Sequence, residues 1–147
     1  MKTVFDPSTR EALISRIEQL QPDSKPLWGK MTAYQMAKHC QLAEEMFLGL
    51  TEYPRSFIGR IFGKMALNSM IKDDKPFMKN AKTSTDFVVT GDGDFEKTKM
   101  EWIRLVKSYD NFSKAFITHW FFGKMTRGQV GLFTYKHIDH HLRQFNL

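Results

Sequence analysis

Near its carboxyl end the chain reads Tyr135-Lys136-His137-Ile138-Asp139-His140-His141-Leu142-Arg143-Gln144. Three of the five histidines of the chain fall in these ten residues. In a helix, His137 and His141 share one face, because residues four apart lie one turn above each other. Two histidines at this spacing can bind one metal ion, as they do in the H-E-x-x-H motif. The alternative is a polar helix end with solvated histidines, and a complete metal site needs a further ligand from elsewhere.

One short pattern occurs twice and predicts the start of two helices. Residues 28–35 and 122–129 both read aromatic-Gly-Lys-Met-Thr-x-x-Gln. A Thr followed three residues later by Gln is a capping box, which marks a helix amino terminus. We therefore expect one helix from Thr32 to about Leu50 and another, equally long, from Thr126 to Gln144. The repeat indicates either an ancestral duplication or shared capping chemistry, and eight residues do not distinguish the two.

The remaining sequence predicts further helices and little strand. Asp6-Pro7 has the signature of a helix start, and that helix is expected to reach about Gln21. Two more helices are expected over residues 55–72 and from Asp94 to about Tyr109. Residues 73–86 are predicted to be an irregular connection, and residues 87–90 a short extended segment. The predicted class is all-α, with four long helices and at most a trace of strand.

Length and composition limit the class of protein. A chain of 147 residues forms most simply one domain, 1–147, with its own core. The net charge of +6 comes without a block of basic residues or a nucleic-acid-binding signature, so we expect no nucleic-acid partner. The single cysteine, Cys40, excludes an internal disulfide. No stretch is suited to a signal peptide or a bilayer span, so we expect a cytoplasmic protein without a membrane partner.

His39 is the candidate for the third metal ligand. It lies in the apolar stripe of the helix that begins at Thr32, where a histidine is more commonly a hydrogen-bonded core residue. If the two equally long helices pack antiparallel with flush ends, His39 comes level with His137 and one turn from His141. With helix axes roughly 8–10 Å apart, imidazoles from both helices can meet at one ion. Cys40 diverges from His39 by about 100° around the helix, so we expect a buried, inert thiol and no ligand.

Parts of the sequence resemble a known family. Residues 28–39, which end in Met36-x-x-His39, and the pattern His137-x-x-x-His141-x-x-Gln144 are similar to the DinB/YfiT-like superfamily. Residues 122–126 and 136–145 resemble its DUF1569 branch. The resemblance covers essentially the whole chain. It implies a four-helix bundle, frequently a homodimer, in which His39, His137 and His141 bind one divalent transition metal, zinc or nickel.

Two functions and one purely structural interpretation fit these features. The superfamily includes metal-dependent hydrolases and thiol S-transferases, so the first is an enzyme of that kind acting on a small molecule. Three protein ligands would leave a position open for water or substrate. No general acid or base stands out, and the catalytic residues stay unknown. The second is a non-catalytic protein that holds a metal or small ligand in a stress or sensor role, and a third treats the histidines as core polar residues. The candidates for pocket or substrate contact are His119, expected in the loop before the last helix, Gln144 and His140.

Overall fold

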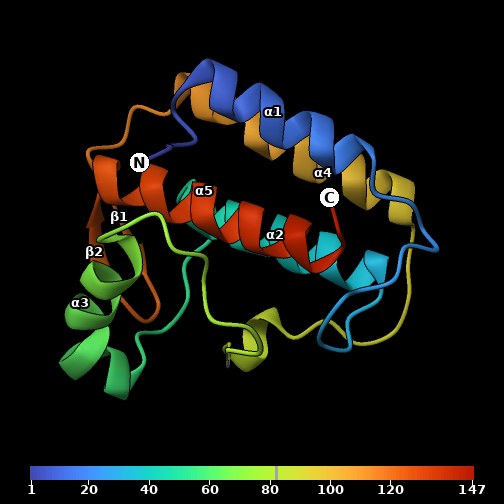
Figure 1. Cartoon of the computed structure of the whole chain (residues 1–147). Helices are drawn as coiled ribbons and strands as arrows, with labels where there is room; N and C mark the ends of the chain where they lie inside the picture. Colours follow the sequence, from blue (N-terminus) through green and yellow to red (C-terminus); the bar gives the residue numbers. More distant parts are fainter. Residues whose placement is uncertain (82) are drawn as a thin grey trace.

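The computed structural model describes residues 1–81 and 83–147, and its regular elements are mainly helical (Figure 1). They are α1 (Pro7–Glu18), α2 (Ala33–Phe47), α3 (Phe57–Ile71), η1 (Thr85–Phe87), α4 (Phe95–Lys107), η2 (Ser108–Asn111), β1 (Phe116–His119), β2 (Gly123–Thr126) and α5 (Arg127–Gln144), where η denotes a short 3-10 helix.

The predicted helix starts are confirmed by their caps. Thr32 and Thr126 each accept a hydrogen bond from the backbone N–H of the Gln three residues on, and each Gln side chain bonds back to the cap. These are complete capping boxes, and they fix where α2 and α5 begin. Asp6 caps α1 with its carboxylate, and Pro7 takes the first helical position.

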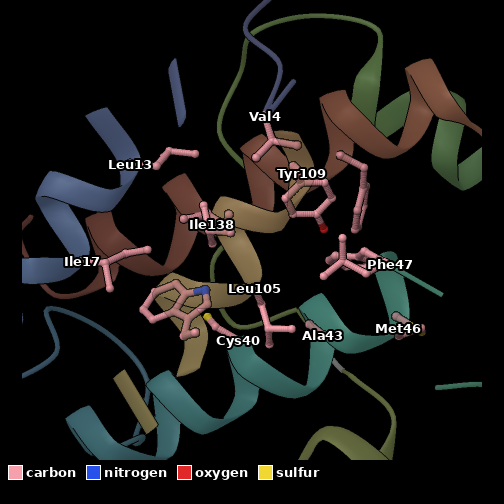
Figure 2. Packing of buried hydrophobic residues seen from close by; sticks show 14 of the residues in the cluster. Val4, Leu13, Ile17, Cys40, Ala43, Met46, Phe47, Leu105, Tyr109 and Ile138 are labelled. Carbon is pink, nitrogen blue, oxygen red and sulfur yellow. The ribbon is translucent and has the colours of Figure 1, made fainter. Parts of the chain in front are cut away.

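The core lies between α1, α2, α4 and α5. Figure 2 shows side chains from these helices gathered in one apolar interior, among them Leu13 of α1, Cys40 of α2, Leu105 of α4 and Ile138 of α5. Contacts join α1 to α4, α4 to α2, α2 to α5 and α5 to α1. The four helices therefore enclose a common core, and α2 and α5 are held as neighbours.

Helices α2 and α5 run antiparallel, as the sequence argument assumed. The backbone N–H of Leu27, just before α2, donates to the carbonyl of Gln144 at the end of α5. At the other end of α2, the ring of Phe47 packs against Phe133 in the first half of α5, with centroids 5.6 Å apart. The start of one helix thus lies beside the end of the other.

The expectation of an all-α four-helix bundle holds only in part. The described residues form five α-helices and, in addition, an antiparallel hairpin in which Phe116 pairs with Thr126 and His119 with Gly123. The hairpin forms where side chains alternate between buried and exposed along both strands, a period of two that fits a strand. Of the segment predicted to be extended at residues 87–90, Phe87 instead ends η1, whereas Val88 has an extended backbone and residues 88–90 lie outside helices and strands. The irregular connection at 73–86 is otherwise as predicted, with Lys82 outside the described residues.

Helix α3 is attached through its glycines. A methyl group at Gly59 or Gly63 would overlap the carbonyl oxygen of Phe121, so both positions admit only a hydrogen. Two glycines in a helix interior cost about 1 kcal/mol each relative to alanine, and close packing on the hairpin turn offsets this cost. Among the helices of the described residues, none combines the length and the apolar character needed to cross a membrane.

Candidate metal centre

His39 is oriented by a backbone carbonyl. Its Nδ1 lies 2.9 Å from the carbonyl oxygen of Phe87 in η1. Because a carbonyl only accepts, Nδ1 carries the proton and Nε2 presents a lone pair. The side chain is 6 % exposed. The α2 helix and η1 together fix both the tautomer and the direction of this ring.

His141 is oriented by an amide side chain. Its Nδ1 lies 3.0 Å from Oε1 of Gln144, three residues on in α5. The Nε2 of Gln144 donates to the carbonyl oxygen of Trp28 at 2.8 Å, which identifies the amide oxygen as the atom facing the histidine. His141 therefore donates from Nδ1, and its Nε2 carries the lone pair. The amide of Gln144 thus holds the ring of His141 through its oxygen and the backbone of Trp28 through its nitrogen.

His137 completes the group. Its Nε2 lies 3.3 Å from Nε2 of His39, while its Nδ1 is buried without a hydrogen-bond partner. The ring packs between Phe47, which meets it edge-on at 5.5 Å between centroids, and Phe133, which is stacked at 6.3 Å. Aromatic packing holds this third imidazole from both sides, and its only hydrogen-bond contact among the described residues is the one with Nε2 of His39.

The arrangement fits a metal ion. One ring nitrogen from each of His39, His137 and His141 lies within 4.8 Å of the others. Two nitrogens bound tetrahedrally to zinc at the usual bond length would be about 3.3 Å apart, which is the separation of the two Nε2 atoms of His39 and His137. A histidine that binds a metal through one ring nitrogen typically donates a hydrogen bond from the other ring nitrogen to an oxygen atom. These three histidines can hold a metal ion.

The electrostatics favour neutral imidazoles. Burial lowers the pKa of His39, and burial together with the neighbouring histidines holds the pKa values of His137 and His141 well below the usual range. A metal binds only the deprotonated nitrogen of imidazole. At neutral pH the three imidazoles are therefore uncharged, and their ring nitrogens can bind a cation.

A family model described as a protein of unknown function (DUF1569) matches residues 6–147. The chain belongs to the DUF1569 family. No curated protein and no solved structure matches it.

His119 of this DUF1569 protein lies elsewhere than predicted. It ends strand β1 instead of lying in a loop, and it is 4 % exposed. Its Nδ1 accepts hydrogen bonds from the backbone N–H groups of Phe121 and Phe122, at 3.0 and 3.2 Å. Burial lowers the pKa of His119 to about 3. This histidine closes the hairpin turn, and the turn is the surface on which α3 packs.

His140 and Cys40 lie outside the three-histidine group. The ring of His140 is half-buried beside Trp28 and Phe77, at centroid distances of 5.7 and 6.0 Å. Cys40 is fully buried with Sγ 3.7 Å from Sδ of Met36, in the core shown in Figure 2. Among the residues that the structure describes, His39, His137 and His141 form the one group of three side chains close enough to bind a metal ion together.

Two contributors to the site were not predicted. The carbonyl oxygens of Phe87 and Trp28 hold His39 and, through Gln144, His141. A backbone carbonyl leaves no side-chain signal in a sequence, because every residue has one. Trp28 lies just before α2, which carries His39, whereas Phe87 lies between α3 and α4, which carry no histidine, and meets α2 only in the folded chain.

Proposed function

We propose that this protein binds one divalent transition metal, zinc or nickel, through His39, His137 and His141, and that it is a DinB/YfiT-like enzyme of the hydrolase or thiol S-transferase type. The observation that carries the proposal is the convergence of three imidazole nitrogens, two of which have their outer nitrogens engaged by oxygen acceptors. A metal in such a site keeps a position for solvent or substrate and polarises what binds there.

The protein residues supply orientation and a dry environment. Phe87 and Gln144 fix the rings of His39 and His141 through hydrogen bonds. The aromatic rings of Phe47 and Phe133 cover His137 and limit access of water. Such a low-dielectric wall strengthens the interaction between a cation and a charged or polarised substrate atom.

A non-catalytic binding protein is the second candidate, and one observation favours it. The described hydrogen-bond acceptors of the histidine rings are a backbone carbonyl and a neutral amide, neither of which exchanges protons near neutral pH. The nearest carboxylate along α2, Glu44, is turned toward Tyr109 in the core, with Oε2 2.5 Å from the phenol oxygen. A stress or sensor role, in which the metal holds a small ligand without turnover, needs no such group.

The metal proposal is tested by elemental analysis of the purified protein. Wild-type protein loaded with zinc or nickel and then dialysed should retain one ion per chain. His39→Ala, His137→Ala and His141→Ala should each lose most of it, because two imidazoles bind far more weakly than three. His140→Ala is the matched control and should retain the ion. Retention by the three variants, or loss by the control alone, would show that the site is elsewhere.

A measurement of substrate turnover distinguishes the enzyme from the non-catalytic binding protein. An enzyme should hydrolyse model amides or esters, or join a thiol to an electrophile, at a rate that follows metal content and disappears with His137→Ala. A binding protein should hold metal in the same stoichiometry and show no metal-dependent rate with any of these substrates.

A further inference from the structure

Helix α3 presents a row of large apolar side chains to solvent. We define the outer face of α3 by the five that are at least half exposed: Phe57 (77 %), Ile58 (61 %), Ile61 (61 %), Phe62 (50 %) and Met65 (66 %). Their spacing of three, four and eight residues places them on one side of the helix. Scattered single apolar residues on a surface need no explanation, but a contiguous set on one helix indicates a binding surface.

The opposite side of α3 fixes this orientation. Gly59, Gly63, Leu67 and Ile71 are buried, and the two glycines lie against the backbone of Phe121 and Phe122. The helix cannot turn its apolar side chains inward without separating from the hairpin turn, because only glycine fits at that contact. Figure 1 shows α3 beside β2 at one end of the molecule, and the side chains of its outer face are exposed there.

The charge around the outer face has one sign. Residues 55–72 include four basic and no acidic residues, namely Arg55, Arg60, Lys64 and Lys72. Arg60 and Lys64 stand one turn apart beside the outer face, and both are exposed. The Nζ of Lys64 donates to the carbonyl oxygen of Lys124 in β2, and Lys124 lies over the exposed ring of Phe116 at 3.8 Å. Arg60, Lys64 and Lys124 form what we call the basic flank.

We propose that the outer face of α3, with its basic flank, docks on an anionic phospholipid surface. A helix with large apolar side chains on one side and basic side chains beside them is suited to the boundary between headgroups and acyl chains. Phenylalanine and isoleucine enter the apolar layer, while arginine and lysine bind the lipid phosphates. The expectation of no membrane partner is revised here, because exposure of these side chains follows from how α3 packs and not from composition.

Charge argues against a second copy of this chain as the occupant. In a symmetric pair formed through α3, an antiparallel arrangement would bring the two basic flanks together. A parallel arrangement would place each flank against residues of α3, none of which is acidic. Like charges at the edge of an interface oppose association, whereas the phosphates of an anionic bilayer complement them.

The test is co-sedimentation of the full chain with phosphatidylcholine vesicles that contain or lack phosphatidylserine. Binding should require phosphatidylserine and weaken as salt is raised. Phe57→Ser/Ile61→Ser should lower the partition coefficient roughly tenfold or more, since two large apolar side chains no longer enter the bilayer. Arg60→Gln/Lys64→Gln should lower it about fivefold for each charge removed. Circular dichroism should show that both variants keep their helices.

Matched substitutions on α4 complete the experiment. Met100 is as exposed as the apolar residues of α3, and Lys97 is an exposed basic residue, so Met100→Ser and Lys97→Gln should leave vesicle binding unchanged. Equal sedimentation with and without phosphatidylserine, or no sedimentation at all, would overturn the proposal. So would a wild-type dimer that becomes a monomer in Phe57→Ser/Ile61→Ser while binding no vesicles, because the outer face would then be an interface between copies. None of these measurements depends on the histidine site.

Discussion

The Nε2 atoms of His39 and His137 lie 3.3 Å apart, although the two residues are 98 positions apart in the chain. His39 has its proton on Nδ1, held by the carbonyl of Phe87, so its Nε2 can only accept. Without a cation, His137 would donate from Nε2 and leave a bare Nδ1 in a buried position with no partner. When a cation is bound, both Nε2 lone pairs can coordinate it. The Nδ1 of His137 lacks a partner in either state, so what a cation adds is coordination by both Nε2 lone pairs in place of a single hydrogen bond between them.

Gln144 should tune metal affinity without being a ligand. In Gln144→Ala, His141 loses the acceptor that fixes its ring, and the metal dissociation constant should rise by about 10- to 100-fold, the usual cost of losing such a supporting hydrogen bond. Isothermal titration with zinc measures this, and the stoichiometry at saturation should stay at one ion. Gln41→Ala, which removes another buried glutamine from α2, should leave the constant unchanged. A fall in stoichiometry would instead make Gln144 a direct ligand.

Cys40 should take no part in metal binding. Its side chain is fully buried beside Met36, and burial, together with the nearby Glu44, raises the pKa of the thiol well above its ordinary value. Cys40→Ala should therefore keep the metal content of the wild type while losing about 1 kcal/mol of stability from the small cavity. Elemental analysis and denaturant unfolding measure the two effects. Loss of metal from a folded Cys40→Ala protein would make the thiol a ligand.

The sequence predicted those parts of the fold that depend on local chemistry. Both capping boxes are complete, because Thr32 and Thr126 each need only a glutamine three residues away. The convergence of the three histidines was predicted from their spacing and from two helices expected to be equally long, although α2 has 15 residues and α5 has 18. The hairpin was not predicted, since residues 122–129 were assigned only to a helix start, whereas residues 123–126 also pair with β1. The burial of His119 likewise depends on stacking against Phe47 and Phe122, which lie together only in the folded chain.

The glycines of α3 should be intolerant of alanine, although alanine is the better helix former. In Gly59→Ala the new methyl would overlap the carbonyl oxygen of Phe121 and lie 2.8 Å from its Cα, and backbone cannot move aside cheaply. Overpacking of this kind costs about 1–3 kcal/mol, more than the gain of up to about 1 kcal/mol in helix propensity. Urea unfolding should show a net loss of stability.

Gly128→Ala provides the contrast. Gly128 also lies in a helix, α5, but an added methyl there would meet no atom within 4 Å. This substitution should leave stability unchanged or raise it by up to about 1 kcal/mol. If Gly59→Ala were as stable as Gly128→Ala, the close contact with the hairpin turn would not be what holds α3.

Glu44 should make the stability of the protein depend on pH. The side chain is fully buried, its Oε1 has no hydrogen-bond partner, and its Oε2 accepts from the hydroxyl of Tyr109. Burial raises the pKa of Glu44 from 4.5 to about 8, with the Tyr109 hydrogen bond acting in the opposite direction. The folded state therefore prefers the neutral acid. Well below pH 4.5 the carboxyl is protonated in both states and adds no pH dependence to the stability.

As pH rises from about 4.5 to 8, the unfolded chain ionises at Glu44 while the folded chain does not, so stability falls by about 1.4 kcal/mol per pH unit. Glu44→Gln cannot ionise and should escape this loss. Its free energy of unfolding, measured by urea denaturation across the same range, should increase relative to wild type as pH rises and level off above about pH 8. Tyr109→Phe removes the hydrogen bond that favours the carboxylate, so its loss of stability should continue to higher pH. A difference between Glu44→Gln and wild type that is the same at pH 5 and pH 8 would mean that Glu44 is ionised in the folded protein.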